Sequence, residues 1–108
     1  MEQQLPQFGL SVHHHDEVAV LDLRGELDLF GAEQLRSVAR ALLDQGVPRL
    51  EIAADDLTFV DSSGFKALLD VRHEALERGT VLEVVAASDR LRWVIEVTGV
   101  GGLLPAGG

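Results

Sequence analysis

The sequence contains no cysteine and comparatively few basic residues. Without cysteine, the chain has neither a disulfide framework nor a thiolate nucleophile. Nine lysines and arginines stand against 18 aspartates and glutamates, so the formal net charge is -9 at pH 7. This balance argues against a nucleic-acid partner, because phosphate backbones select basic surfaces. It is compatible with a basic protein partner, although acidic surfaces also serve solubility.

The sequence also lacks a secretion signal and any long apolar run. Residues 1–15 do not show a basic start followed by an apolar stretch. No segment approaches the ~20 apolar residues that a membrane span needs. We therefore expect a cytoplasmic protein without membrane insertion. The 108 residues, 46% of them hydrophobic, predict one domain over residues 1–108 with its core at about 8–104.

Apolar residues recur with the spacing of strands in several segments. Alternation over Phe8–Val12 and a nearly continuous apolar run over Val18–Leu23 predict two strands. The polar residues between them, His13–Glu17, predict a turn, so that the two strands form an antiparallel hairpin. The second strand is expected to be central and covered on both faces. Further strands are predicted at Arg49–Ala54, at Val81–Ala87 and, as a short edge strand, at Leu103–Leu104.

Three other segments carry the apolar repeat of amphipathic helices. The first is Leu35–Leu43, which Gly46 ends. The second runs from about Ser63 to Arg78, and its apolar stripe of Phe65, Leu68, Leu69 and Leu76 is broken by Arg72. The third is capped by Ser88 and Asp89 and has Leu91, Val94 and Ile95 on one face. The order β-β-α-β-α-β-α-(β) predicts an α/β fold. Its mixed central sheet begins with the antiparallel hairpin, continues with parallel strands and is packed with helices.

The turn between the third strand and the second helix carries the candidate site. Its residues, Asp61, Ser62 and Ser63, offer side-chain oxygens that can cap a helix. The serine hydroxyls also lie beside unpaired backbone N–H groups at the positive end of the helix dipole, where a phosphate would find donors. We expect this turn to share one sheet edge with the turns at Gly25–Asp28 and Ala87–Asp89, since sites in α/β proteins lie beyond the carboxyl ends of strands.

An enzyme, a metal site and a bound cofactor all fit the sequence poorly. The turn lacks the G-x-S-x-G elbow of serine hydrolases, and His73 lies ~15 Å from Ser63 along the predicted helix axis. The adjacent histidines at 13–15 point different ways on a strand, and no second cluster has zinc-like spacing. The glycine-rich residues 99–102 lack the lysine of a phosphate loop and read as a flexible turn.

Taken together, four pieces of sequence resemble the STAS domain of anti-sigma factor antagonists. They are Gly25–Asp28, Asp55–Gly64 with its D-S-S-G element, Gly79 with the strand that follows, and Leu91–Val100. The resemblance runs from about Phe8 to Leu104, and the D-S-S-G element is its most specific part. Relatives usually add a last helix after the fifth strand; we expect it to be missing here, since the sequence ends at Gly108. Phe30, Trp93 and the histidines at 13–15 are not family signatures.

The resemblance implies a phosphorylation switch. In such proteins the second hydroxyl residue of the turn accepts the phosphate, which is Ser63 here, with Ser62 as a less favoured candidate. The implied partner is an anti-sigma factor with serine kinase activity, which binds the unphosphorylated antagonist and thereby frees a sigma factor. A phosphatase resets the cycle. The implied partner-binding residues are Asp28, Asp61, Ser62, Ser63, Gly64 and Lys66.

Several alternatives stay open at this point. The two serines can simply cap the helix. Asp61 is either the N-cap, which we favour, or a group that orients the phosphate chemistry, and Asp28 is either a cap or a partner contact. Trp93 is either exposed at an interface or partly buried against the C-terminal segment. The functional alternative is a STAS scaffold subunit of a transporter or signalling complex in which Ser63 is never modified.

Overall fold

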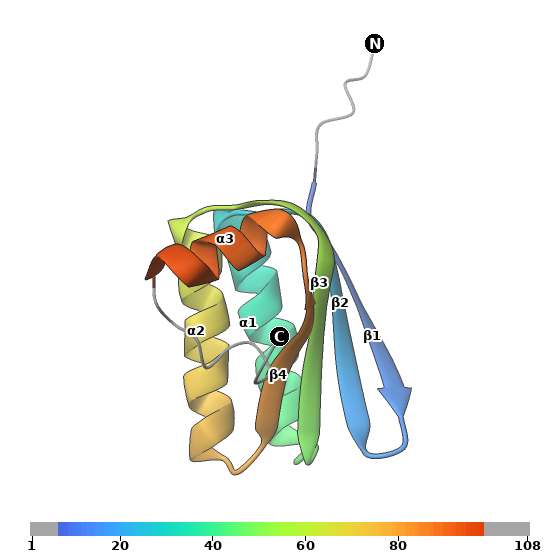
Figure 1. The fold of residues 1–108 in the computed structure, drawn as a ribbon. Coiled ribbons are helices and arrows are strands. Elements are labelled where there is room, and N and C mark those ends of the chain that lie inside the picture. The colour runs from blue at the N-terminus through green and yellow to red at the C-terminus, as the bar shows by residue number, and fades with distance from the viewer. Residues whose placement is uncertain (1–6, 99–108) are drawn as a thin grey trace.

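The computed structural model describes residues 7–98, which form a four-stranded sheet and three helices (Figure 1). The elements are β1 (Gly9–His15), β2 (Val18–Leu27), α1 (Leu29–Asp44), β3 (Arg49–Val60), α2 (Ser62–Glu77), β4 (Val81–Ala87) and α3 (Asp89–Thr98). β1 pairs antiparallel with β2, and β2, β3 and β4 pair in parallel. The predicted element order and mixed sheet are thus confirmed. The strand expected at Leu103–Leu104 and the region of the expected missing helix lie outside the described residues.

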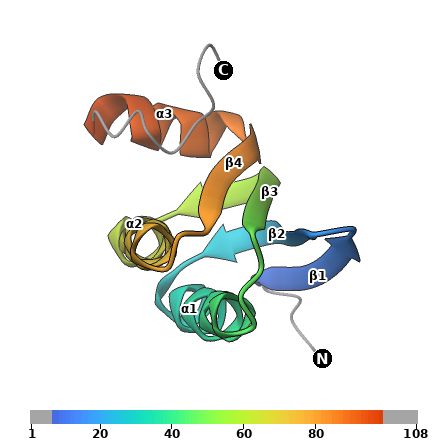
Figure 2. The same cartoon turned by 90° about the horizontal axis from the view of Figure 1, so that it is seen from below.

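All three helices lie on one side of the sheet (Figure 2). The strands appear in the sheet in chain order, β1-β2-β3-β4, so both crossovers between parallel strands run in the same direction. Because such crossovers are right-handed, α1 and α2 must fall on the same face. The core lies between this face and the helices and includes Leu21, Leu23, Leu50, Ile52, Val84, Leu35, Leu68, Leu91 and Ile95. None of the three helices is both long and apolar enough to cross a membrane.

The opposite face of the sheet is not covered by the described residues. Val18 and Val20 of β2 are half-buried there, and Val81 and Val85 of β4 are 52% and 42% exposed. Within residues 7–98, the prediction that the second strand is covered on both faces is therefore not confirmed. A continuous apolar run is also compatible with one covered face when its outward residues are valines that neighbouring side chains half-shield.

β2 extends further than the sequence predicted, to Leu27, and β3 does not end at Ala54 but runs on through the apolar residues Leu57, Phe59 and Val60. Their parallel ladder passes through two register shifts, and Gly25 within it adopts a left-handed φ of 85°. An extra residue in one strand breaks the two-residue alternation, which is why the sequence pattern placed the strand end too early. This extension carries the strands up to the sheet edge where α1 and α2 begin.

The histidines do not form the hairpin turn that the sequence predicted. His13, His14 and His15 belong to β1, and the connection to β2 is made by Asp16 and Glu17 alone. Asp16 adopts a φ of 57°, a left-handed conformation that aspartate tolerates in tight hairpins. Polar residues on an exposed edge strand leave no hydropathy signal, so their strand assignment was missed.

The predicted apolar stripe of α2 is rotated relative to the observed one. The buried residues are Gly64, Phe65, Ala67, Leu68, Val71 and Ala75. Leu76, which the pattern placed on the stripe, is 60% exposed. Small alanines let α2 lie close to its neighbours, and a pattern based on large apolar residues gives them too little weight.

Candidate functional site

The starts of the three helices lie along one edge of the sheet, at the carboxyl ends of β2, β3 and β4 (Figure 1). Leu27 pairs with Val60, and the N–H of Asp61 donates to the carbonyl of Leu27 at 3.2 Å. The N–H of Ser88 likewise donates to the carbonyl of Ala54 at 3.0 Å. The expectation that the three turns share an edge is confirmed.

Asp61 is the N-cap of α2. Its Oδ1 accepts a hydrogen bond from the N–H of Gly64 at 2.8 Å, and its carbonyl accepts one from the N–H of Phe65 at 2.9 Å. Ser62 and Ser63 are therefore the first two helical residues, whose N–H groups have no acceptor one turn earlier in the helix. Ser62 is exposed and Ser63 half-buried, so neither residue is enclosed in the core. The cap is a carboxylate, which leaves the serine hydroxyls with no capping role.

Gly64 is buried because the start of α2 lies directly against the end of β2. A Cβ added to Gly64 would lie 2.2 Å from the carbonyl oxygen of Leu27 and 2.6 Å from its Cγ. Any larger residue would push the helix start away from the strand. The role of Gly64 is therefore to let the serines sit close to the sheet edge.

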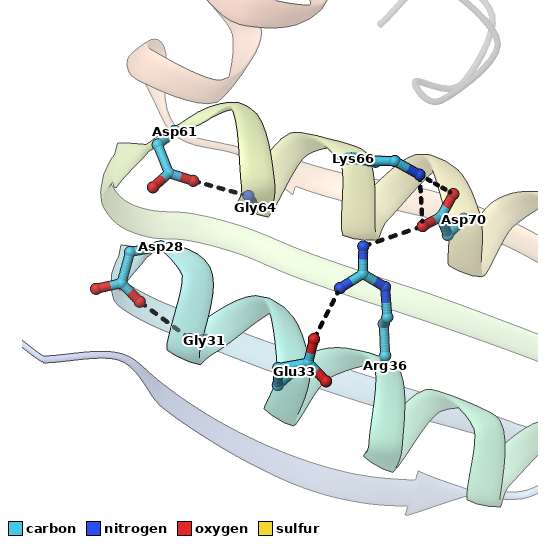
Figure 3. Close-up of polar contacts among 8 residues, drawn as sticks. All are labelled: Asp28, Gly31, Glu33, Arg36, Asp61, Gly64, Lys66 and Asp70. Carbon is cyan, nitrogen blue, oxygen red and sulfur yellow. Dashed lines mark hydrogen bonds and ion pairs between the residues drawn. The ribbon is translucent and has the colours of Figure 1, made fainter.

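The start of α1 repeats the arrangement of α2 (Figure 3). Asp28 is its N-cap, and its Oδ1 accepts a hydrogen bond from the N–H of Gly31 at 3.0 Å. Gly31 is buried, since a Cβ there would lie 2.8 Å from Cγ of Phe8. Of the two roles left open for Asp28, the structure therefore supports the cap.

The same Asp-x-x-Gly geometry thus presents different side chains at the two helix starts. Between cap and glycine, α2 carries Ser62 and Ser63, whereas α1 carries Leu29 and Phe30, which are 56% and 79% exposed. This apolar pair was not among the site residues predicted from the sequence. The repeated Asp-x-x-Gly spacing after two strands was the signal that could have found it.

A family model described as "Mlab, STAS domain" matches residues 10–105. The chain belongs to the STAS domain family.

Two relatives of this STAS domain are antagonists by name. The anti-sigma-B factor antagonist of Bacillus subtilis (strain 168) is 25% identical over 92 residues, which are 85% of this chain and 84% of that protein. The crystal structure of an anti-sigma factor antagonist from Mycobacterium paratuberculosis matches with a TM-score of 0.80 at 30% identity, over 92% of this chain and 84% of that chain. Both names describe the antagonist of another protein and no catalysed reaction.

A third relative is known in two states of modification. The unphosphorylated form of the anti-sigma factor antagonist SpoIIAA matches with a TM-score of 0.77 at 25% identity, over 90% of this chain and 86% of that chain. The phosphorylated form of SpoIIAA from Bacillus matches with a TM-score of 0.74 at 25% identity, over 90% and 89% of the two chains.

Lys66 of this STAS domain lies one turn after the serines and belongs to an ion-pair network between α1 and α2 (Figure 3). Its Nζ contacts the two carboxylate oxygens of Asp70 at 3.3 and 3.4 Å. From α1, Arg36 donates to the same carboxylate at 3.0 Å and to Glu33 at 3.4 Å. The hydrogen bond from Arg36, with a smaller contribution from Lys66, lowers the pKa of Asp70 from its ordinary value of 3.8.

We expect Asp70→Asn to remove part of the acid sensitivity of the STAS domain. The pKa of Asp70 is lower in the folded than in the unfolded chain, so its contribution is complete above the unfolded value and is lost as the pH falls through the folded one. Because the side chain is 43% exposed, we expect only about 0.5 kcal/mol at neutral pH. Urea unfolding from about pH 7 to about pH 2 measures this difference.

The matched control is Glu96→Gln, which removes one charge from an exposed position of α3. The difference between the wild type and Asp70→Asn should disappear at the acid end of the series. A difference that persists at the lowest pH would show that the carboxylate charge is not its source.

The remaining candidates of the sequence analysis lie elsewhere or outside the described residues. The histidines of β1 are exposed, and the described residues contain no group of three metal-ligating side chains. His73 lies 3.4 Å from Glu77. Trp93 is 56% exposed and lies 5.8 Å from the guanidinium of Arg90, which is also 6.0 Å from the ring of Phe59. Residues 99–102 lie outside the described part of the chain.

Proposed function

We propose that this STAS domain is a cytoplasmic anti-sigma factor antagonist that is switched off by phosphorylation of Ser63. In its unphosphorylated form it binds an anti-sigma factor with serine kinase activity, and a sigma factor is released. A phosphatase restores the binding form. The observation that carries the proposal is the serine pair at the start of α2, outside the core and within the D-S-S-G element on which the resemblance to antagonists rests.

The geometry of the helix start explains how such a switch works without unfolding. Phosphoserine carries about -1.5 to -2 charges at pH 7, and a helix N-terminus stabilises negative charge. The domain itself should therefore accept the phosphate. A partner surface fitted to a neutral hydroxyl would not, and the neighbouring carboxylates of Asp28 and Asp61 add like charge at the same edge. The interface is lost while the fold is kept.

Between the two serines, we assign the phosphate to Ser63. The resemblance to the family supports this choice, since the second hydroxyl residue of the turn is the usual acceptor. Exposure alone would favour Ser62, which is the more open of the two. The resemblance therefore favours Ser63 and exposure favours Ser62, and a measurement that locates the phosphate on one residue decides between them.

Mass spectrometry of the protein from its own cells tests the modification. Trypsin releases the peptide Leu50–Lys66, which contains both serines. We expect a form heavier by about 80 Da, the mass of a phosphoryl group, with fragment ions placing the added mass on Ser63. Ser63→Ala expressed in the same cells is the control and should lack this form. Absence of phosphate in every growth state, with co-purification of a membrane complex, would instead support the unmodified scaffold subunit.

A further inference from the structure

The start of α1 exposes two large apolar side chains in a place where most domains bury them or use polar residues. Leu29 is 56% exposed and Phe30 is 79% exposed, the highest value among the exposed large hydrophobic residues of the described part of the chain. An isolated exposed leucine needs no explanation. A leucine and a phenylalanine side by side, next to a proposed binding site, indicate an interaction surface.

The backbone around this pair holds it in the exposed position. Asp28 caps the helix, and Gly31 is packed on Phe8, so the first turn of α1 cannot rotate to bury Phe30. Beside Phe30 lies an open hollow of about 410 Å³ whose walls include Phe8, Asp28 and Gln34. Phe30 therefore projects next to a recess in the surface, so a partner could contact both the phenyl ring and the recess beside it.

The charges that flank the pair are negative. Asp28 and Asp61 each use Oδ1 to cap a helix, and Figure 3 shows the second oxygen of both carboxylates pointing away from the helices. Leu27 pairs with Val60, so the two caps that follow these residues lie next to each other at the ends of adjacent strands. The carboxylates of Asp28 and Asp61 therefore lie on the same edge as the apolar pair, in a chain whose net charge is -9.

We propose that Leu29 and Phe30 form the apolar anchor of the docking surface and insert into an apolar pocket of a partner protein, rimmed by lysine or arginine. The inference rests on the proposed function, because it assumes that the anti-sigma factor docks at this edge. The carboxylates would repel an anionic lipid surface and would also repel the same edge of a second copy of the chain. A basic protein is the occupant that matches both the apolar and the charged features.

Photo-crosslinking from position 30 tests which molecule covers the anchor. The probe is p-benzoylphenylalanine, placed at position 30 or, as the control, at position 76, where Leu76 is 60% exposed at the far end of α2. We expect one heteromeric adduct from position 30 and none from position 76. No adduct from position 30, identical adducts from both, an adduct with a second copy or a link to the chain's own residues 1–6 would each overturn the proposal.

The partner that the crosslink identifies is then purified, and titrating the STAS domain with it measures how much the anchor contributes to affinity. Phe30→Ala should weaken binding about thirtyfold, as expected for a central aromatic anchor, and its melting temperature should not change because Phe30 is exposed. Leu76→Ala should bind as the wild type does. Added salt should weaken binding if the pocket has a basic rim. Wild-type affinity in Phe30→Ala, or binding that does not respond to salt, would refute the proposal.

Ser63→Asp in the same titration separates this inference from the proposed switch. Loss of affinity in Phe30→Ala with none in Ser63→Asp would leave the anchor in place and remove the switch. Loss in Ser63→Asp with none in Phe30→Ala would keep the switch and remove the anchor.

Discussion

Replacing Gly64 with alanine should lower the free energy of unfolding by about 3 kcal/mol, because the added methyl has no room. Its Cβ would lie 2.2 Å from the carbonyl oxygen of Leu27, a backbone atom that cannot swing aside like a side-chain end. That carbonyl also accepts the N–H of Asp61, so moving it disturbs the bond that joins β2 to the start of α2. Urea unfolding followed by circular dichroism measures the loss.

Gly46→Ala is the matched control for this substitution. Gly46 has a left-handed φ of 78°, and nothing lies within 4 Å of a Cβ built on it. Its replacement should cost only the conformational strain, about 1 kcal/mol. If Gly64→Ala were no less stable than Gly46→Ala, close contact between the helix start and β2 would not be needed for the fold.

The features of the fold that periodicity encodes could be predicted from sequence. The element order, the hairpin and the position of α2 follow from apolar repeats and from glycine stop signals, and the Asp61 cap follows from its place before the repeat. The common edge for the three turns follows from parallel strands joined by crossovers. These features depend on local sequence and on the right-handedness of crossovers, and both can be inferred from a single sequence.

Other features depend on contacts between distant segments, and the sequence pattern could not supply them. The continuation of β3 to Val60 depends on a ladder with irregular register to β2, and the burial of Gly64 depends on a backbone atom of Leu27. The exposure of Leu76 depends on how closely the alanines of α2 approach their neighbours. The exposure of Leu29 and Phe30 depends on how the start of α1 packs against Phe8, and the apolar repeat that begins at Leu35 does not reach this pair.

Replacing Ser63 with aspartate should weaken binding to the proposed partner, an anti-sigma factor, about a hundredfold while the STAS domain stays folded. The new carboxylate sits in the first turn of α2, where the helix dipole stabilises it by a few tenths to about 1 kcal/mol. In the proposed complex the same charge would face the partner beside Asp28 and Asp61, so the cost would fall on the complex alone. Isothermal titration with the purified partner measures affinity, and thermal unfolding measures stability.

Two further variants decide whether the loss comes from the charge at this position. Ser37→Asp adds the same charge at an exposed place in the middle of α1, and it should leave the affinity unchanged. Ser63→Ala should bind like the wild type but take up no phosphate from the kinase. Equal weakening in Ser37→Asp would assign the effect to the net charge of the chain. A stable Ser63→Asp that binds with wild-type affinity would show that negative charge at the start of α2 does not control docking, and the phosphorylation switch would have to be abandoned.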